Sequence, residues 1–217
     1  MASEPNRPPP QRPTRGWHQR LPNALTIARL VLAAAFVLVL SLPWARPGAT
    51  AWLLFAAALF VIAAITDALD GHLARRLNAI TRFGRVMDPF ADKILVLSAY
   101  ILLAGPAFRL QTDAGPIQAS GVHAWMVALL LARELLVTSL RGLVESEGGD
   151  FSAGALGKLK MIAQSVAAPL ALAILSFDDQ GDSHALLTLI ALGVVGITML
   201  SAVPYVRRAM QASDQST

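Results

Sequence analysis

Six long apolar runs place the strongest constraint on how this chain can fold. Each is close to the roughly 20 residues that an α-helix needs to cross the hydrocarbon core of a bilayer. Hydrophobic residues make up 55% of the 217 and charged residues only 15%, whereas globular domains average about 25% charged. A soluble fold is therefore disfavoured. We predict an all-α, polytopic integral membrane protein with six transmembrane helices, at 22–43, 49–69, 88–108, 122–143, 157–176 and 184–206.

The distribution of basic residues predicts how these helices are oriented. One side of the membrane receives 13 arginines and lysines, and the other only Arg46 and Arg109. Because positive loops stay in the cytoplasm, we expect both termini to be cytoplasmic and the protein to lie in the inner (plasma) membrane. This placement accounts for the net charge of +4, so no nucleic-acid partner is expected. The 13 are Arg7, Arg12, Arg15, Arg20, Arg75, Arg76, Arg82, Arg85, Arg141, Lys158, Lys160, Arg207 and Arg208.

The chain divides into one membrane domain and two tails. Residues 1–16 are rich in Pro and Arg and cannot bury apolar area, which predicts a disordered cytoplasmic tail. Residues 17–210 form the six-helix domain, and residues 211–217 form a short polar tail. The first apolar run is long for the core of a signal peptide, so we expect it to be retained. Cysteine is absent, which excludes disulfides and thiolate metal sites.

Four aspartates lie where the second and third apolar runs meet the cytoplasm. Asp67 and Asp70 are three residues apart and Asp88 and Asp92 are four apart, so each pair shares one face of a helix. Carboxylates brought together across a short loop need cations to offset their repulsion. Oxygen ligands without His or Cys favour Mg²⁺, Mn²⁺ or Ca²⁺. The segment is therefore a candidate metal site with its active face toward the cytoplasm.

Simpler interpretations of this segment stay open. Gly71 would be the C-cap of a solvated helix end, and Arg75 and Arg76 would be cytoplasmic anchors. His72 falls outside the face that the aspartates share, so a solvated loop histidine is the simpler interpretation of it than a metal ligand.

A polar stripe also runs along the first apolar run. The segment "NALTIAR" places Asn23, Thr26 and Arg29 three residues apart from one another. Because an arginine is costly in lipid, we expect Arg29 to face the site or to pair with an aspartate.

Basic residues gather in the fourth and fifth runs. The segments "ARELLVTSLRG" and "GKLKM" contain Arg133, Arg141, Lys158 and Lys160, with Glu134 beside the first of them. Together they predict a basic pocket opposite the aspartates, because Arg offers two parallel donors to a phosphate and Lys a point charge. Anchoring at the cytoplasmic side is the alternative, weakest for Arg133 because it lies deeper in its run. The pocket predicts an acceptor that carries its own phosphate.

The charged segment between the second and third runs resembles a family signature. From Asp67 to Asp92 the sequence reads "DALDGHLARRLNAITRFGRVMDPFAD", which resembles the signature of the CDP-alcohol phosphotransferase family. The resemblance implies a homodimeric enzyme among membrane lipids, which transfers a phosphatidyl-type group from a CDP-linked lipid to an alcohol and releases CMP. The eight matching positions are Asp67, Asp70, Gly71, Ala74, Arg75, Gly84, Asp88 and Asp92.

The resemblance also implies a role for each position. Asp67, Asp70 and Asp88 would bind two Mg²⁺ (or Mn²⁺) ions, and Asp92 would complete the metal site and act as the general base. The CDP-lipid would lie against the small and basic positions of the signature and the polar stripe of the first run: Gly71, Ala74, Arg75, Gly84, Asn23, Thr26 and Arg29.

The remaining segments narrow the expected substrate. "NALTIAR", "ARELLVTSLRG" and "GKLKM" are similar to segments of the bacterial phosphatidylglycerophosphate synthases, one branch of the family, whose acceptor is sn-glycerol 3-phosphate. That similarity implies that Arg133, Arg141 and Lys158 bind the acceptor phosphate, and we add Lys160. Met161 departs from the small polar residue expected there, and the amino-terminal extension has no counterpart.

The expected reaction therefore joins glycerol 3-phosphate to the phosphatidyl group of CDP-diacylglycerol. Another acceptor, such as an inositol phosphate, serine or phosphatidylglycerol, is the alternative within the family. A cation or proton transporter is the alternative from another class, but it would place its carboxylates near the middle of the membrane on discontinuous helices.

Overall fold

The computed structural model describes residues 17–77, 82–113, 115–146 and 154–215. Within these ranges, side chains are described for 24, 26–67, 90, 91, 93–142, 154–208 and 210, residue 114 excepted.

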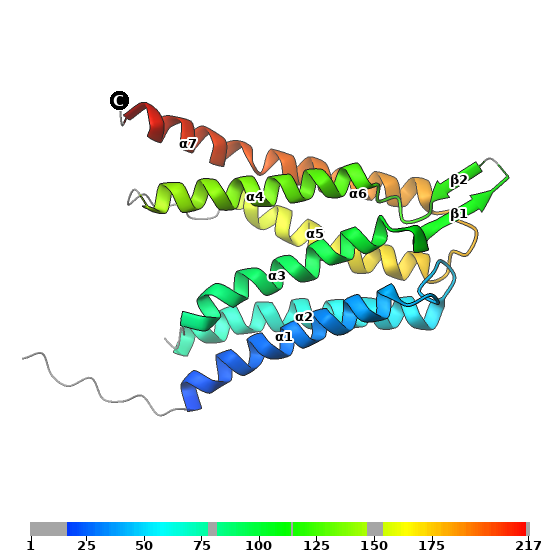
Figure 1. The fold of residues 1–217 in the computed structure, drawn as a ribbon, viewed down its shortest axis with the longest axis horizontal. Helices are drawn as coiled ribbons and strands as arrows, with labels where there is room; N and C mark the ends of the chain where they lie inside the picture. The colour runs from blue at the N-terminus through cyan, green and yellow to red at the C-terminus, as the bar shows by residue number, and fades with distance from the viewer. Residues whose placement is uncertain (1–16, 78–81, 114, 147–153, 216–217) are drawn as a thin grey trace, which may run out of the picture.

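The fold is a bundle of long helices with one small hairpin (Figure 1). The mostly helical character predicted from the sequence is confirmed, and α1 to α6 each lie on one of the six apolar runs. The described elements are α1 (Trp17–Ser41), α2 (Thr50–Leu77), α3 (Arg82–Leu103), the 3-10 helix η1 (Pro106–Phe108), β1 (Arg109–Thr112), β2 (Gly115–Gln118), α4 (Ala124–Ser146), α5 (Ala155–Leu175), α6 (His184–Leu200) and α7 (Val203–Gln215).

Three helical stretches of the described chain are long and apolar enough to cross a membrane. They are Thr50–Asp67, Ala155–Leu175 and His184–Arg208, and Thr26–Ser41 and Lys93–Leu103 are shorter apolar stretches. Large hydrophobic side chains such as Leu38 and Leu189 are more than half exposed on the outside of the bundle. An apolar outer surface of this kind suits a lipid environment.

The helices pack in a chain of neighbours around an apolar core. α1 packs against α2 and α3, α2 against α5, α5 against α6, and α4 against α6 and α7. The rings of Phe36 and Phe60 join α1 to α2 edge to face, with centroids 5.5 Å apart. Small buried residues, among them Ala56 on α2 and Ala168 on α5, allow those two helices to approach closely.

The hairpin is the feature that the sequence prediction missed. The third run was expected to stay helical to residue 108, but α3 ends at Leu103, three residues before Pro106. Proline has no N–H to donate and disfavours helix in the residue before it. The chain then forms the antiparallel pair β1 and β2, with Arg109 opposite Gln118 and Thr112 opposite Gly115.

The sixth run also differs from its prediction. It was expected to form one helix to residue 206, but α6 ends at Leu200 and α7 begins at Val203. Pro204 explains the break, because its ring clashes with the carbonyl four residues earlier in a continuous helix, whereas proline fits the first turn of a new one. The turn places Ser201 inside the bundle, where it is fully buried.

Candidate active site

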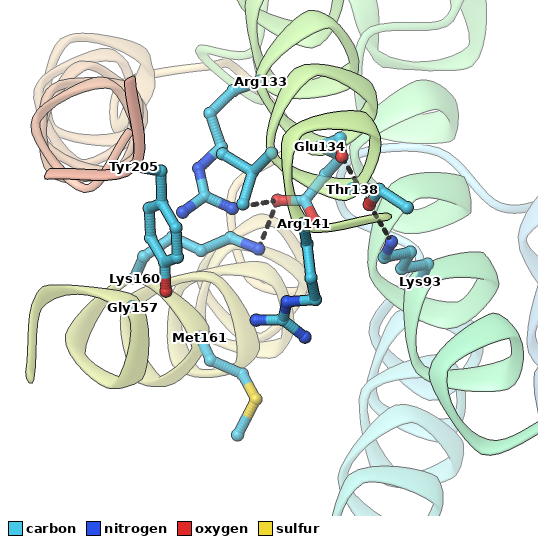
Figure 2. Close-up of a pocket in the computed structure, with 10 residues that line it drawn as sticks. Lys93, Arg133, Glu134, Thr138, Arg141, Gly157, Lys160, Met161 and Tyr205 are labelled. Atoms are coloured by element: carbon cyan, nitrogen blue, oxygen red, sulfur yellow. Dashed lines mark hydrogen bonds and ion pairs between the residues drawn. The ribbon is translucent and has the colours of Figure 1, made fainter. Parts of the chain in front are cut away.

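A basic cavity opens between α3, α4, α5 and α7. Its volume is about 420 Å³, and its lining holds four cationic side chains and one carboxylate, which gives a formal charge of 4 − 1 = +3. The lining side chains belong to α3, α4, α5 and α7 and converge on this space (Figure 2). The lining consists of Lys93, Arg133, Glu134, Val137, Thr138, Arg141, Gly157, Lys160, Met161 and Tyr205.

The inner wall of the cavity is built around Arg133. This arginine is buried, and its Nη2 donates a 2.8 Å hydrogen bond to the hydroxyl of Ser201 in the turn between α6 and α7. Its guanidinium carbon lies 5.8 Å from the centre of the Tyr205 ring, within the range of a cation–π contact. Arg133 is thus held in place by the α6–α7 turn and by α7.

Glu134 links two of the cavity's cations. Its Oε1 lies 3.3 Å from Nη1 of Arg133 and forms an ion pair with Nζ of Lys160 (Figure 2). Glu134 is nearly buried, so a lone carboxylate there would be costly without these partners. The Glu134 bridge fixes the positions of Arg133 and Lys160 and offsets part of their charge.

Arg141 and Lys93 form the opposite wall. The Nε of Arg141 is buried and has no hydrogen-bond partner in the described part of the chain. In Figure 2 its side chain extends into the cavity, between Met161 and Lys93. Lys93 on α3 donates a 2.6 Å hydrogen bond to the hydroxyl of Thr138 on α4. This wall therefore offers cationic donors to an anion that enters the cavity.

Sequence reasoning found most, but not all, of this cavity. The structure brings the predicted residues Arg133, Arg141 and Lys160 together, whereas Lys158 is exposed and does not line the cavity. Lys93 and Tyr205 were missed. Lys93 directly follows Asp92, the last residue of the signature, and this position next to the signature could have indicated that Lys93 lies at the site. Nothing in the local pattern distinguishes Tyr205.

At the aspartate segment, the described side chains form an ion pair. Nη1 of Arg29 lies 2.6 Å from Oδ1 of Asp67, with Arg29 1% exposed and Asp67 31% exposed. The expectation that Arg29 pairs with an aspartate is confirmed. Thr26, one turn before Arg29 on α1, is also buried.

The other predicted residues of this segment have side chains outside the described set. Their backbone lies in helices, so the spacing argument for the aspartate pairs holds along α2 and α3. The interpretation of Gly71 as a helix C-cap is wrong, because α2 continues beyond it to Leu77. The residues concerned are Asn23 on α1, Asp70, Gly71, His72, Ala74, Arg75 and Arg76 on α2, and Gly84, Asp88 and Asp92 on α3.

The chemistry of the donor set decides which metal would fit here. Among the described side chains no group of three or more His, Cys, Asp or Glu lies together, and Asp67 is the one signature aspartate that this set includes. The four signature aspartates are carried by two helices, α2 and α3, and the carboxylate of Asp67 is partly exposed and pairs with the guanidinium of Arg29. An all-oxygen set of this kind fits a hard divalent cation such as Mg²⁺ or Mn²⁺.

Comparison with known proteins identifies the family. Residues 19–204 match the family model of the CDP-alcohol phosphatidyltransferases. Two similar curated proteins are both named CDP-diacylglycerol–glycerol-3-phosphate 3-phosphatidyltransferase. The one from Bacillus subtilis (strain 168) is 40% identical over 157 residues, and the one from Escherichia coli (strain K12) is 39% identical over 154 residues. Each match covers 68% of this chain and 73% of the relative. The chain therefore belongs to the CDP-alcohol phosphatidyltransferase family.

Proposed function

We propose that this chain transfers the phosphatidyl group of CDP-diacylglycerol to sn-glycerol 3-phosphate, forming phosphatidylglycerol phosphate and releasing CMP. The observation that carries the proposal is the basic cavity, in which Arg133, Arg141 and Lys160 surround a space suited to a phosphate. The printed names of the relatives, which include both substrates, support the same acceptor.

The CDP-lipid is bound at the carboxylate end of α2 and α3. Asp67, Asp70, Asp88 and Asp92 would hold two divalent ions, Mg²⁺ or Mn²⁺, and such ions would supply positive charge to offset that of the diphosphate. Arg29 orients the carboxylate of Asp67 through their ion pair. The small and polar positions around this site make room for the nucleotide and contact the diphosphate: Asn23, Thr26, Gly71, Ala74, Arg75 and Gly84.

The acceptor is held at the basic cavity. Arg141 and Lys160 bind the phosphate of glycerol 3-phosphate, and Arg133 supports them from the inner wall. Lys158, exposed near the start of α5, adds positive charge at the approach to the cavity. Binding one end of a small acceptor orients its free hydroxyl toward the second substrate.

Asp92 then accepts the proton of that hydroxyl as the oxygen attacks the lipid-side phosphorus. A new phosphorus–oxygen bond forms to the acceptor, and the bond to CMP breaks. Asp92 immediately precedes Lys93, which lines the cavity, so the base and the acceptor site share one helix, α3.

The arrangement in the membrane follows from the distribution of charge. We place all six helices, α1 to α6, across the inner membrane, with both termini and the active site on the cytoplasmic side. The carboxylate ends of α2 and α3 lie at the end of the bundle opposite the hairpin (Figure 1). Three tryptophans near the hairpin end are exposed: Trp44 in the loop after α1, Trp52 at the start of α2 and Trp125 at the start of α4. Tryptophan is enriched at membrane interfaces.

We also assign a homodimer as the working assembly, on the strength of the family membership. Native mass spectrometry of the protein released from detergent would measure it, and a monomer that is fully active would contradict it.

The proposed activity is tested with purified protein, CDP-diacylglycerol, Mg²⁺ and labelled glycerol 3-phosphate. The wild type should form the phosphorylated lipid. Arg141→Ala should raise the KM for glycerol 3-phosphate by about 10- to 100-fold, because a charge-assisted hydrogen bond is lost, with little change in the KM for the CDP-lipid. Arg207→Ala, which removes an exposed arginine on α7 outside the cavity lining, is the matched control.

Two results would contradict the assignment. Equal effects of Arg141→Ala on both substrates would show that the cavity does not bind the acceptor. Product formed with inositol phosphate, serine or phosphatidylglycerol, and none with glycerol 3-phosphate, would replace the proposed acceptor by another.

A further inference from the structure

We propose that Lys93 is a further acceptor-site residue, which binds the acceptor's phosphate directly. Thr138 is the positioning residue that orients the ammonium group of Lys93 toward this phosphate. The inference rests on the proposed function, because it assigns a new residue to the same phosphate site. Lys93 lies one residue beyond the charged segment, and Thr138 lies within "ARELLVTSLRG", but the sequence pattern assigned a role to neither.

The first argument is the position of Lys93 between the two parts of the site. It is the one cation of the cavity lining that α3 supplies, whereas the other three come from α4 and α5. α3 also carries Asp88 and Asp92. A phosphate bound to Lys93 therefore lies beside the helix of the proposed base, which shortens the path from acceptor hydroxyl to Asp92.

The second argument is the hydrogen bonding of the ammonium group. Thr138 donates its hydroxyl proton to the backbone carbonyl of Glu134 at 2.7 Å, so its oxygen is left as an acceptor toward Lys93. Lys93 uses one N–H for this 2.6 Å bond. An ammonium has three donors, and within the described chain no other hydrogen bond is formed by Lys93. Two donors thus remain for a ligand.

The third argument is electrostatic. Four cations share the lining with one carboxylate, and like charges at close range raise each other's free energy. A bound phosphate dianion offsets most of the excess charge. If the Lys93–Thr138 bond merely joined α3 to α4, a neutral side chain would do this without adding repulsion.

The test compares variants in their binding of inorganic phosphate and of glycerol 3-phosphate. Lys93→Gln keeps a donor for Thr138 but removes the charge. Thr138→Val removes the acceptor for Lys93, and Thr138→Ser keeps it. Arg208→Gln removes an exposed arginine on α7 outside the cavity lining and is the control. Full-length protein in detergent is used throughout.

We expect both phosphate compounds to raise the Tm of the wild type, because a ligand that binds only the folded state stabilises it. Lys93→Gln should weaken binding and raise the KM for glycerol 3-phosphate by about 10- to 100-fold, with the KM for CDP-diacylglycerol unchanged. Thr138→Val should show a smaller loss of the same kind. Thr138→Ser and Arg208→Gln should behave like the wild type.

The inference is overturned if Lys93→Gln binds both phosphate compounds as tightly as the wild type, or if it impairs both substrates equally. Should Lys93→Gln fail to fold, the comparison of Thr138→Val with Thr138→Ser decides the question in the same way. Failure of the proposed function looks different: the wild type would then make no product from glycerol 3-phosphate, while its Lys93-dependent binding of inorganic phosphate would persist.

Discussion

Arg29 illustrates how a single charged residue can be accommodated in an apolar helix. A cation in the hydrocarbon region is costly unless it is paired or faces the interior of the bundle. Arg29 is almost completely buried, and its guanidinium meets the carboxylate of Asp67 on the next helix. The pair joins α1 to the signature segment of α2, so a residue outside the signature orients one of its carboxylates.

Asp178 is a second residue whose environment is set by its neighbours, in the loop between α5 and α6. Its carboxylate accepts backbone N–H groups of Gly181, Asp182 and Ser183, at 2.6, 3.0 and 2.7 Å. Burial raises the pKa of Asp178, but these hydrogen bonds, with one from the Ser183 hydroxyl, lower it by more, so the net pKa lies below the ordinary 3.8. The ionised form therefore stabilises the loop that leads into α6.

This environment predicts a pH dependence of stability. Because the folded pKa is lowered, the stabilisation is present above pH 3.8 and is lost as the pH falls through the folded value. Asp178→Asn should reduce the free energy of unfolding by about 1–3 kcal/mol at pH 7, and the difference from wild type should narrow at the acidic end of a thermal melting series. Asp179→Asn, exposed beside it, is the control. A difference in stability between Asp178→Asn and the wild type that stays constant down to about pH 2.5 would contradict this role of the Asp178 carboxylate.

Among the elements, α3 shows how a helix that ends before a proline has its last carbonyls satisfied by side chains distant in sequence. Ser120 donates a 2.5 Å hydrogen bond to the carbonyl of Leu103, and the Gln118 amide donates to the same carbonyl at 2.8 Å. The last carbonyls of a helix have no partner within it, so these side chains complete the end of α3. Ser120 also accepts the N–H of Val122, which ties the hairpin to the start of α4.

Ser120→Ala should therefore destabilise the protein more than the removal of one small hydroxyl group would suggest. The change leaves a buried carbonyl and a buried N–H with fewer partners, which costs about 1–3 kcal/mol. Thr112→Ala is the matched control, because it removes one side-chain hydrogen bond at the tip of the hairpin. Unfolding in mixed micelles measures both. If the two variants lose the same stability, Ser120 has no special part in ending α3.

At the scale of the whole molecule, the bundle encloses the charged side chains of α4. α4 carries Arg133, Glu134 and Arg141, which explains why it is not among the three long apolar stretches, yet these residues face the cavity rather than lipid. A helix of this kind can still cross a membrane if its charged face is covered by other helices. The described packing of α4 against α6 and α7 supplies that cover.

The proposed orientation is tested by labelling single cysteines, since the natural chain has none. Asp113→Cys, exposed at the hairpin, should react with a membrane-impermeant maleimide in intact cells. Arg208→Cys, exposed on α7, should react only after the membrane is opened. The cysteine-free parent is the control for background labelling. The reverse pattern would place the termini and the basic cavity outside the cell.

The local sequence determined the helical class, the position of the six apolar runs and the clustering of acidic and basic residues at their ends. These properties follow from composition and from the 1.5 Å rise per residue, which depend only on near neighbours. The pairing of Arg29 with an aspartate was also predictable, because a buried arginine must find a partner.

Only the tertiary structure decided which basic residues share the cavity. Lys160 lines it while Lys158, two residues earlier, is exposed, because that choice depends on how α5 is rotated against α3 and α4. Lys93 on α3 and Tyr205 on α7 also line the cavity. No short segment of sequence shows which helices pack beside α3 and α7. The carbonyl at the end of α3 likewise finds its partner in Ser120, 17 residues further along the chain. Helix rotation and partner choice are properties of the packed bundle, and the chemistry of the site depends on both.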